Sequence, residues 1–141
     1  MYSAFLHTHS GLRWIVLILL IINILNAAGC LKGKAVTPQM KKLSLFGLIA
    51  THVQFLTGLV LYWQSPKVQF SENTMGNDLL RFFTMEHSVM MLIAIVLITI
   101  GNRHAKLGNG KRMFWMYLIA LIVILIGIPW PFRAALGGSW F

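Results

Sequence analysis

The chain has 141 residues, of which 57% are hydrophobic and only 11% are charged, and its mean hydropathy is +0.74. A soluble globular domain carries about 25% charged residues, so a water-facing surface is excluded. The net charge of +9 does not indicate nucleic-acid binding, because eight of the twelve Lys and Arg residues lie in two short segments between apolar runs. They are Lys32, Lys34, Lys41, Lys42, Arg103, Lys106, Lys111 and Arg112. We therefore predict a single domain embedded in a membrane.

Four apolar stretches are long enough to cross a bilayer, whose hydrocarbon core requires about 20 helical residues. The predicted helices span residues 4–28, 43–63, 79–102 and 113–128. Helix-breaking or capping residues flank them: Gly29 and Gly33, Pro66, Asn77 or Asp78, and Pro129 and Pro131. The predicted fold class is an all-α membrane four-helix bundle.

The basic residues also predict how the bundle is oriented. The first and third connections hold the eight cations named above and no acidic residue, which is typical of cytoplasmic loops. On the other side, Lys67 and Arg81 are accompanied by Glu72 and Asp78. We expect both termini to lie on the periplasmic side of a bacterial inner membrane.

Five ionisable residues of note fall within the predicted spans: His9, Arg13, His52, Glu86 and His87. Such residues are expensive in lipid and usually face the bundle interior, so each one is a candidate functional residue. The fourth helix has none and is predicted to be a packing helix.

Helical periodicity places His9 on one stripe with Arg13, Val16, Leu20, Asn23 and Ala27, whereas His7 points away. His87 shares a stripe with Met91, Ala94, Ile98 and Gly101. The small residues at positions 94 and 101 leave a shallow groove beside His87. That groove suits either a flat macrocycle or a neighbouring helix.

The depths of the histidines along their predicted helices suggest a cofactor site. His9 and His87 both lie roughly 8–12 Å from the outer end of their helices, and His52 lies roughly 16 Å deep. Histidines on facing helices can hold a b-type haem from both sides. We expect His9 and His87 to bind the haem iron, with His52 a further candidate in the cofactor site.

Two charged residues have alternative roles beside this site. Arg13, one turn below His9, could pair with a haem propionate. In the absence of haem its acidic partner would be Glu86, which could otherwise orient a ligand imidazole or serve a proton route. Zinc, nucleophilic, copper and phosphate chemistry lack the residue groupings that they need, so a stand-alone enzyme is not the favoured reading.

Four segments also carry a family resemblance: His7-Thr-His-Ser-Gly-Leu-Arg-Trp14, Thr51-His-Val-Gln54, Glu86-His87 and Ile128-Pro-Trp-Pro-Phe132. They resemble small bacterial four-helix membrane proteins described as cytochrome b-like, which are similar in outline to CopD-like bundles. The resemblance implies an inner-membrane protein that binds haem b. Larger four-helix cytochromes have four ligand histidines for two haems, whereas three histidines lie within the membrane here.

Three functions fit the sequence. The first is a one-haem electron carrier, linked to a quinone. The second is a cofactor-free accessory subunit of a larger membrane complex or homo-oligomer, in which His9, Arg13, Glu86 and His87 form a buried network. The third is a proton-coupled transport element using Glu86 and the histidines.

The orientation gives a first prediction. A reporter that works only in the periplasm should be active when fused after Phe141 and silent when inserted near Lys34 or Gly108, because the basic connections stay in the cytoplasm. Reporter activity at Lys34 would reverse the assignment.

Overall fold

The computed structural model describes residues 1–138 and 140, and every regular element in this part of the chain is helical. The elements are α1 (Tyr2–Leu31), α2 (Pro38–Gln64), α3 (Asp78–Arg81), a π-helical turn (Phe82–Glu86), α4 (His87–Lys106), α5 (Gly110–Gly127) and a 3-10 turn (Ala134–Leu136). Four spans are long and apolar enough to cross a membrane: α1, α2, the continuous stretch Asp78–Lys106, and α5. The predicted all-helical fold with four such spans is confirmed.

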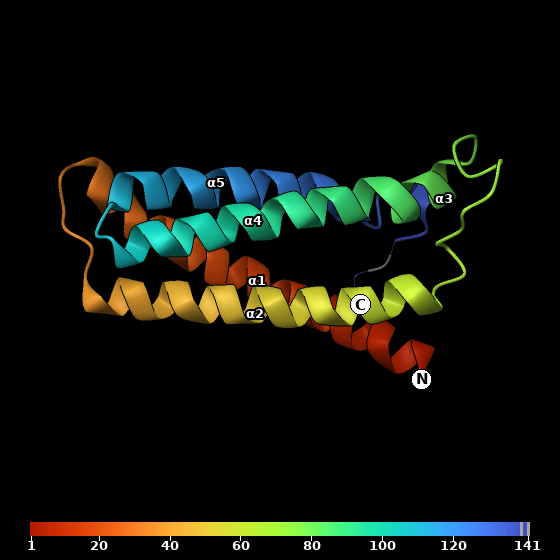
Figure 1. Ribbon diagram of the computed structural model, residues 1–141, viewed down its shortest axis with the longest axis horizontal. Coiled ribbons are helices and arrows are strands. Elements are labelled where there is room, and N and C mark those ends of the chain that lie inside the picture. Colours follow the sequence, from red (N-terminus) through yellow and green to blue (C-terminus); the bar gives the residue numbers. More distant parts are fainter. Residues whose placement is uncertain (139, 141) are drawn as a thin grey trace.

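The four long helices form a closed ring in which α1 packs on α2 and α5, and α4 packs on α2 and α5. Figure 1 shows the α1–α2 and α4–α5 connections at one end of the bundle and the N-terminus at the other, with the long loop before α3. All eight cations at the α1–α2 and α4–α5 connections are exposed at the same end. Which end faces the cytoplasm stays a prediction.

The helices differ from the predicted spans mainly at their ends, because caps and headgroup-level residues extend them beyond the apolar core. Thr37 caps α2 by accepting the Met40 N–H at 3.2 Å, and Pro38 occupies the first turn, so α2 starts five residues before position 43. Asn109 caps α5 in the same way. Asn77 caps the third helix, as predicted.

The predicted stripes face the bundle interior. On α1 the buried positions include Val16, Leu20, Asn23 and Ala27, and on α4 they include Ala94, Ile98 and Gly101. The groove on α4 accepts a neighbouring helix at Gly101, because the Tyr117 ring of α5 lies where a Cβ at Gly101 would stand. The groove therefore accepts a neighbouring helix, one of its two predicted occupants, at the end near the basic connections.

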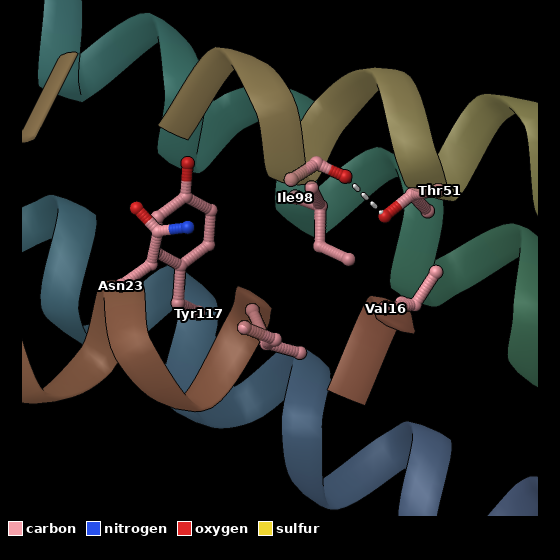
Figure 2. Close-up of a pocket in the computed structure, with 7 residues that line it drawn as sticks. Val16, Asn23, Thr51, Ile98 and Tyr117 are labelled. Carbon is pink, nitrogen blue, oxygen red and sulfur yellow. Dashed lines mark hydrogen bonds between the residues drawn. The ribbon is translucent and has the colours of Figure 1, made fainter. Parts of the chain in front are cut away.

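A buried polar cluster joins all four helices in the half of the bundle near the basic connections. The Ser44 hydroxyl donates to Asn102 Oδ1 at 2.9 Å and bonds to the Tyr117 hydroxyl. The Asn23 amide donates to the carbonyls of Leu19 and Leu43. Figure 2 shows Asn23 beside Tyr117. The space between these residues and their neighbours is too small for a water molecule. α5 therefore contributes a polar contact that its lack of ionisable residues did not predict.

Gly101 gives a stability prediction with a matched control. Replacing Gly101 by Ala should lower the free energy of unfolding by about 1–3 kcal/mol, because the new methyl group overpacks the Tyr117 ring. Gly11 also lies inside a long helix, but a Cβ there meets nothing within 4 Å. Gly11→Ala should be neutral or slightly stabilising. Thermal unfolding in detergent measures both, and equal effects would contradict the close contact.

Candidate functional site

His9 on α1 and His87 on α4 lie together in the half of the bundle away from the basic connections. We call this half the outer half and the opposite half the inner half, as names for the two ends of the bundle and not for sides of the membrane. The two ring centroids are 6.3 Å apart, and the ring planes are inclined by 73°. This histidine pair comes from two helices that occupy diagonal positions in the ring, so the two imidazoles meet across the bundle interior. Of the histidines singled out in the sequence, these are the two that the structure brings together.

Hydrogen bonds to Nδ1 define the proton positions of both rings. The Thr57 hydroxyl donates to the Gln54 carbonyl at 2.8 Å, so its oxygen accepts from His9 Nδ1 at 3.2 Å. His87 Nδ1 lies 2.7 Å from the Gly127 carbonyl oxygen, which can only accept. Each neutral ring therefore carries its proton on Nδ1 and its lone pair on Nε2.

Two glycines let helix backbones approach the rings. A Cβ at Gly58 of α2 would stand 3.0 Å from His9 Cε1, closer than an ordinary contact. Gly127 is the last residue of α5, where the Gly127 carbonyl accepts from His87. With Gln54 donating to the His9 carbonyl at 2.9 Å, residues of all four long helices converge on the histidine pair.

A π-helical turn leads directly into His87. The His87 N–H bonds to the Phe82 carbonyl, five residues back, so one extra residue is accommodated in the turn. The Phe82 and Phe83 rings lie 5.9 and 6.1 Å from the His87 ring. Single π-turns inside helices are frequent at functional sites. This turn fixes where His87 points relative to the segment before it.

The C-terminal tail reaches the level of Arg13, one turn below His9. The Trp140 carbonyl accepts hydrogen bonds from Arg13 Nη2 at 2.6 Å and from Trp14 Nε1 at 3.3 Å. Trp14, Trp130 and Trp140 pack on one another with centroids 6.1–6.3 Å apart. Trp140 therefore packs on α1 at Arg13 and Trp14, one turn from His9 along the helix.

Glu86 belongs to a separate ion-pair group. Arg81 Nε lies 2.8 Å from Glu86 Oε1, and Arg81 Nη2 lies 2.9 Å from Asp78 Oδ1. The Glu86 side chain is 38% exposed. Because Glu86 immediately precedes His87 on the helix, the two side chains diverge, and the carboxylate turns to the outer end of the bundle. The structure therefore pairs Glu86 with Arg81.

The remaining histidines lie apart from the pair. His52 is exposed on the outer side of α2, where its Nδ1 donates to the Leu48 carbonyl at 2.8 Å. His7 is exposed near the start of α1, as predicted from its position away from the His9 stripe. His104 lies at the opposite end of the bundle, near the end of α4.

Several residues of the site were missed by sequence reasoning. Thr57 and Gly127 hold the two rings, and nothing in their type marks them as partners of histidine. Gly58 and Gly127 did offer a signal, because a glycine inside an apolar helix often marks a close approach. Comparison with known proteins found no match among family models, curated proteins or solved structures. The case for function therefore depends on the geometry of this site.

The Thr57–His9 bond is testable by a double-mutant cycle. Thr57→Val keeps the shape of the side chain but strands the His9 Nδ1 proton, so it should cost about 0.5–1.5 kcal/mol of unfolding free energy. In a His9→Phe background the same change should cost much less. Equal costs in both backgrounds, measured by thermal unfolding in detergent, would show that the bond contributes nothing.

Proposed function

We propose that this protein is a membrane electron carrier that would bind one haem b between α1 and α4, with His9 and His87 as the residues that would hold the haem iron. The observation that carries the proposal is the histidine pair itself. Two neutral imidazoles from different helices, each with its Nδ1 bound to a protein acceptor, are the donor set that a six-coordinate b-type haem takes from its protein.

The spacing of the rings supports this assignment. An imidazole nitrogen binds a first-row metal ion at about 2 Å, and the ring centre lies roughly 1 Å behind that nitrogen. Two imidazoles on opposite sides of one ion therefore have centres about 6 Å apart. The observed centroid separation of 6.3 Å is close to this value, which supports the two rings as ligands of one ion.

The hydrogen bonds support it as well. A ligand histidine usually donates its second ring N–H to a carbonyl, carboxylate or hydroxyl, which fixes the ring and raises its basicity. Thr57 serves His9 in this way, and the Gly127 carbonyl serves His87. Within residues 1–138 and 140, no three His, Cys, Asp or Glu side chains form a metal-binding group. A cofactor that needs two protein ligands therefore suits the site better than a bare metal ion.

Arg13 would bind a propionate of that haem. Its guanidinium lies one turn from His9 on the face that points into the bundle, and an arginine carries five N–H donors in a planar fork suited to carboxylates. The haem supplies one-electron redox chemistry, and the protein contributes ligands, a charge partner and exclusion of water. The cytochrome b-like resemblance agrees with this role, and a membrane quinone is the proposed electron partner.

A cofactor-free accessory subunit is the second candidate, and one observation favours it. The bonds that hold the two rings also connect α1 with α2 and α4 with α5, so the pair would fix helix register even without haem. Buried hydrogen bonds of this kind are a common way to specify packing in membrane bundles.

Absorption spectra distinguish the two candidates. The protein purified from cells supplied with haem should show a Soret band and a sharp band on reduction. Both bands should be lost in His9→Ala and in His87→Ala, because each variant removes one axial ligand. A colourless wild-type protein would contradict haem binding and favour the accessory-subunit role.

Two histidines serve as matched controls for these spectra. His7→Ala and His52→Ala remove imidazoles that are exposed and do not belong to the pair, so both should retain the bands at wild-type intensity. Loss of the bands in His52→Ala alone would move the ligand assignment to His52.

The role of Arg13 has its own test. Arg13→Gln should weaken haem retention by removing the propionate partner, and the effect should be the same in a Glu86→Gln background, because Glu86 is paired with Arg81. Competition with apomyoglobin measures haem loss. Strong non-additivity between the two substitutions would instead show that Arg13 and Glu86 act as a pair.

A further inference from the structure

A pocket lies at the outer end of the bundle, between the loop that follows α2 and the π-helical turn. Its volume is about 490 Å³, within the range of about 300–1,000 Å³ that small-molecule sites occupy. The loop contributes five of its lining residues and the turn contributes two: Phe70, Ser71, Glu72, Thr74, Met75, Thr84 and Met85. None of the residues that hold the histidine pair lines it, so this pocket is a separate site.

Hydrogen bonds fix the two walls of the pocket relative to each other. The Gln69 N–H donates to Thr84 Oγ1 at 3.1 Å, and the Gln69 carbonyl accepts from the hydroxyls of Thr74 at 2.8 Å and Thr84 at 3.3 Å. From α2, the Tyr62 hydroxyl donates to the Thr84 carbonyl at 3.0 Å, and the Tyr62 ring packs edge-on against Phe70. The pocket is therefore formed before a ligand arrives, which lowers the entropic cost of binding.

The hydroxyl groups of the lining are already used within the protein. Thr74 and Thr84 both donate to the Gln69 carbonyl. Because the Thr74 proton is committed there, the Ser71 hydroxyl donates to Thr74 Oγ1 at 3.2 Å. The side chains of the pocket therefore offer a ligand no free hydroxyl proton, and an anion would find no donor among them.

Glu72 is the charged residue among those that line the pocket, and its carboxylate is unpaired. In the part of the chain that the structure describes, the ion pairs are those of Asp78 and Glu86, both with Arg81. They leave the exposed Glu72 carboxylate without a cation. The charge that the pocket presents to a ligand is thus negative, although the net charge of the chain is +9.

The remaining lining is apolar and exposed. The exposed fractions are 78% for Phe70, 58% for Met75 and 41% for Met85. The face of an aromatic ring attracts cations, and methionine side chains adapt to ligands of irregular shape. A carboxylate beside an aromatic ring and two thioethers complements a positive charge carried on an apolar body.

We propose that this pocket binds an organic cation with a bulky apolar body, whose charge pairs with Glu72. A bare metal ion, with ligands about 2.0–2.6 Å away, would leave most of the volume empty. A neutral apolar molecule would leave the Glu72 carboxylate without a partner, and an anion would be repelled by it. The proposal does not depend on haem binding.

Two probes test this preference: tetraphenylphosphonium and triphenylphosphine oxide share an apolar triphenyl body, and the first of them carries a positive charge. Each is titrated calorimetrically into the full chain in phosphatidylcholine nanodiscs, with empty nanodiscs as the blank for partition into lipid. Tetraphenylphosphonium should bind as one ion per chain and more tightly than the oxide. The net charge of +9 opposes this result, so a preference for the cation requires a local negative site. Equal affinities, or no binding above the blank, would overturn the proposal.

Variants locate the binding site. Glu72→Gln keeps the side-chain shape and should weaken tetraphenylphosphonium binding about two- to fivefold, the range of an exposed ion pair, while oxide binding stays unchanged. Asp78→Asn is the matched control, because it removes the same charge at the same end of the bundle, outside the pocket. It should bind tetraphenylphosphonium as the wild type does. Met75→Ser should weaken both probes by removing part of the apolar wall. Equal losses in Glu72→Gln and Asp78→Asn would show that overall charge attracts the probe and would overturn the site.

Discussion

The bilayer core provides no water, so each polar group placed there must find its partner within the protein. This requirement organises the bundle at two levels. Near the basic connections, Ser44, Asn102 and Tyr117 bond to one another, and the Asn23 amide bonds to backbone carbonyls. Nearer the outer end, the Thr57 hydroxyl and the Gly127 carbonyl hold the histidine pair. Between these levels the interior also buries Thr51, whose hydroxyl donates to the Gly47 carbonyl of its own helix.

The two levels differ in the lone pairs that they leave available to a ligand. The inner cluster is compact, and its hydroxyl groups and the Asn23 NH2 group bond to one another or to carbonyls. Asn23 Oδ1 has no partner, and the space beside it has no room for water. The outer level contains two imidazoles whose Nδ1 atoms are bound, which leaves their Nε2 lone pairs available. Two buried nitrogen lone pairs without donors do not stabilise helix packing, but they can bind a metal ion. This contrast is the physical reason for placing the proposed cofactor at the outer level.

Much of this arrangement was accessible from the sequence, because it depends on rules that act along one helix. Length and hydropathy predicted four spans, and the helical period placed Val16, Asn23 and Ala94 inside and His7 outside. The rest depends on contacts between helices, which a single sequence does not encode in any local pattern. The hydroxyl of Tyr117 reaching Ser44, the carbonyl of Gly127 meeting His87 and the pairing of Glu86 with Arg81 are of this kind. The last helix packs on α1 and α4, and for the same reason its two polar contacts, from Tyr117 and Gly127, were not predicted.

The π-helical turn before His87 bears on how such a protein can change during evolution. A π-turn corresponds to one residue inserted into a regular helix. Deleting one codon among positions 82–86 would restore the α-helical ladder while rotating the preceding segment by about 100° relative to α4. Asn77, Arg81 and the loop held by Thr84 would then face new neighbours, although α4 itself would be unchanged. An insertion of this kind allows the outer loops to be re-aimed without disturbing the bundle below them.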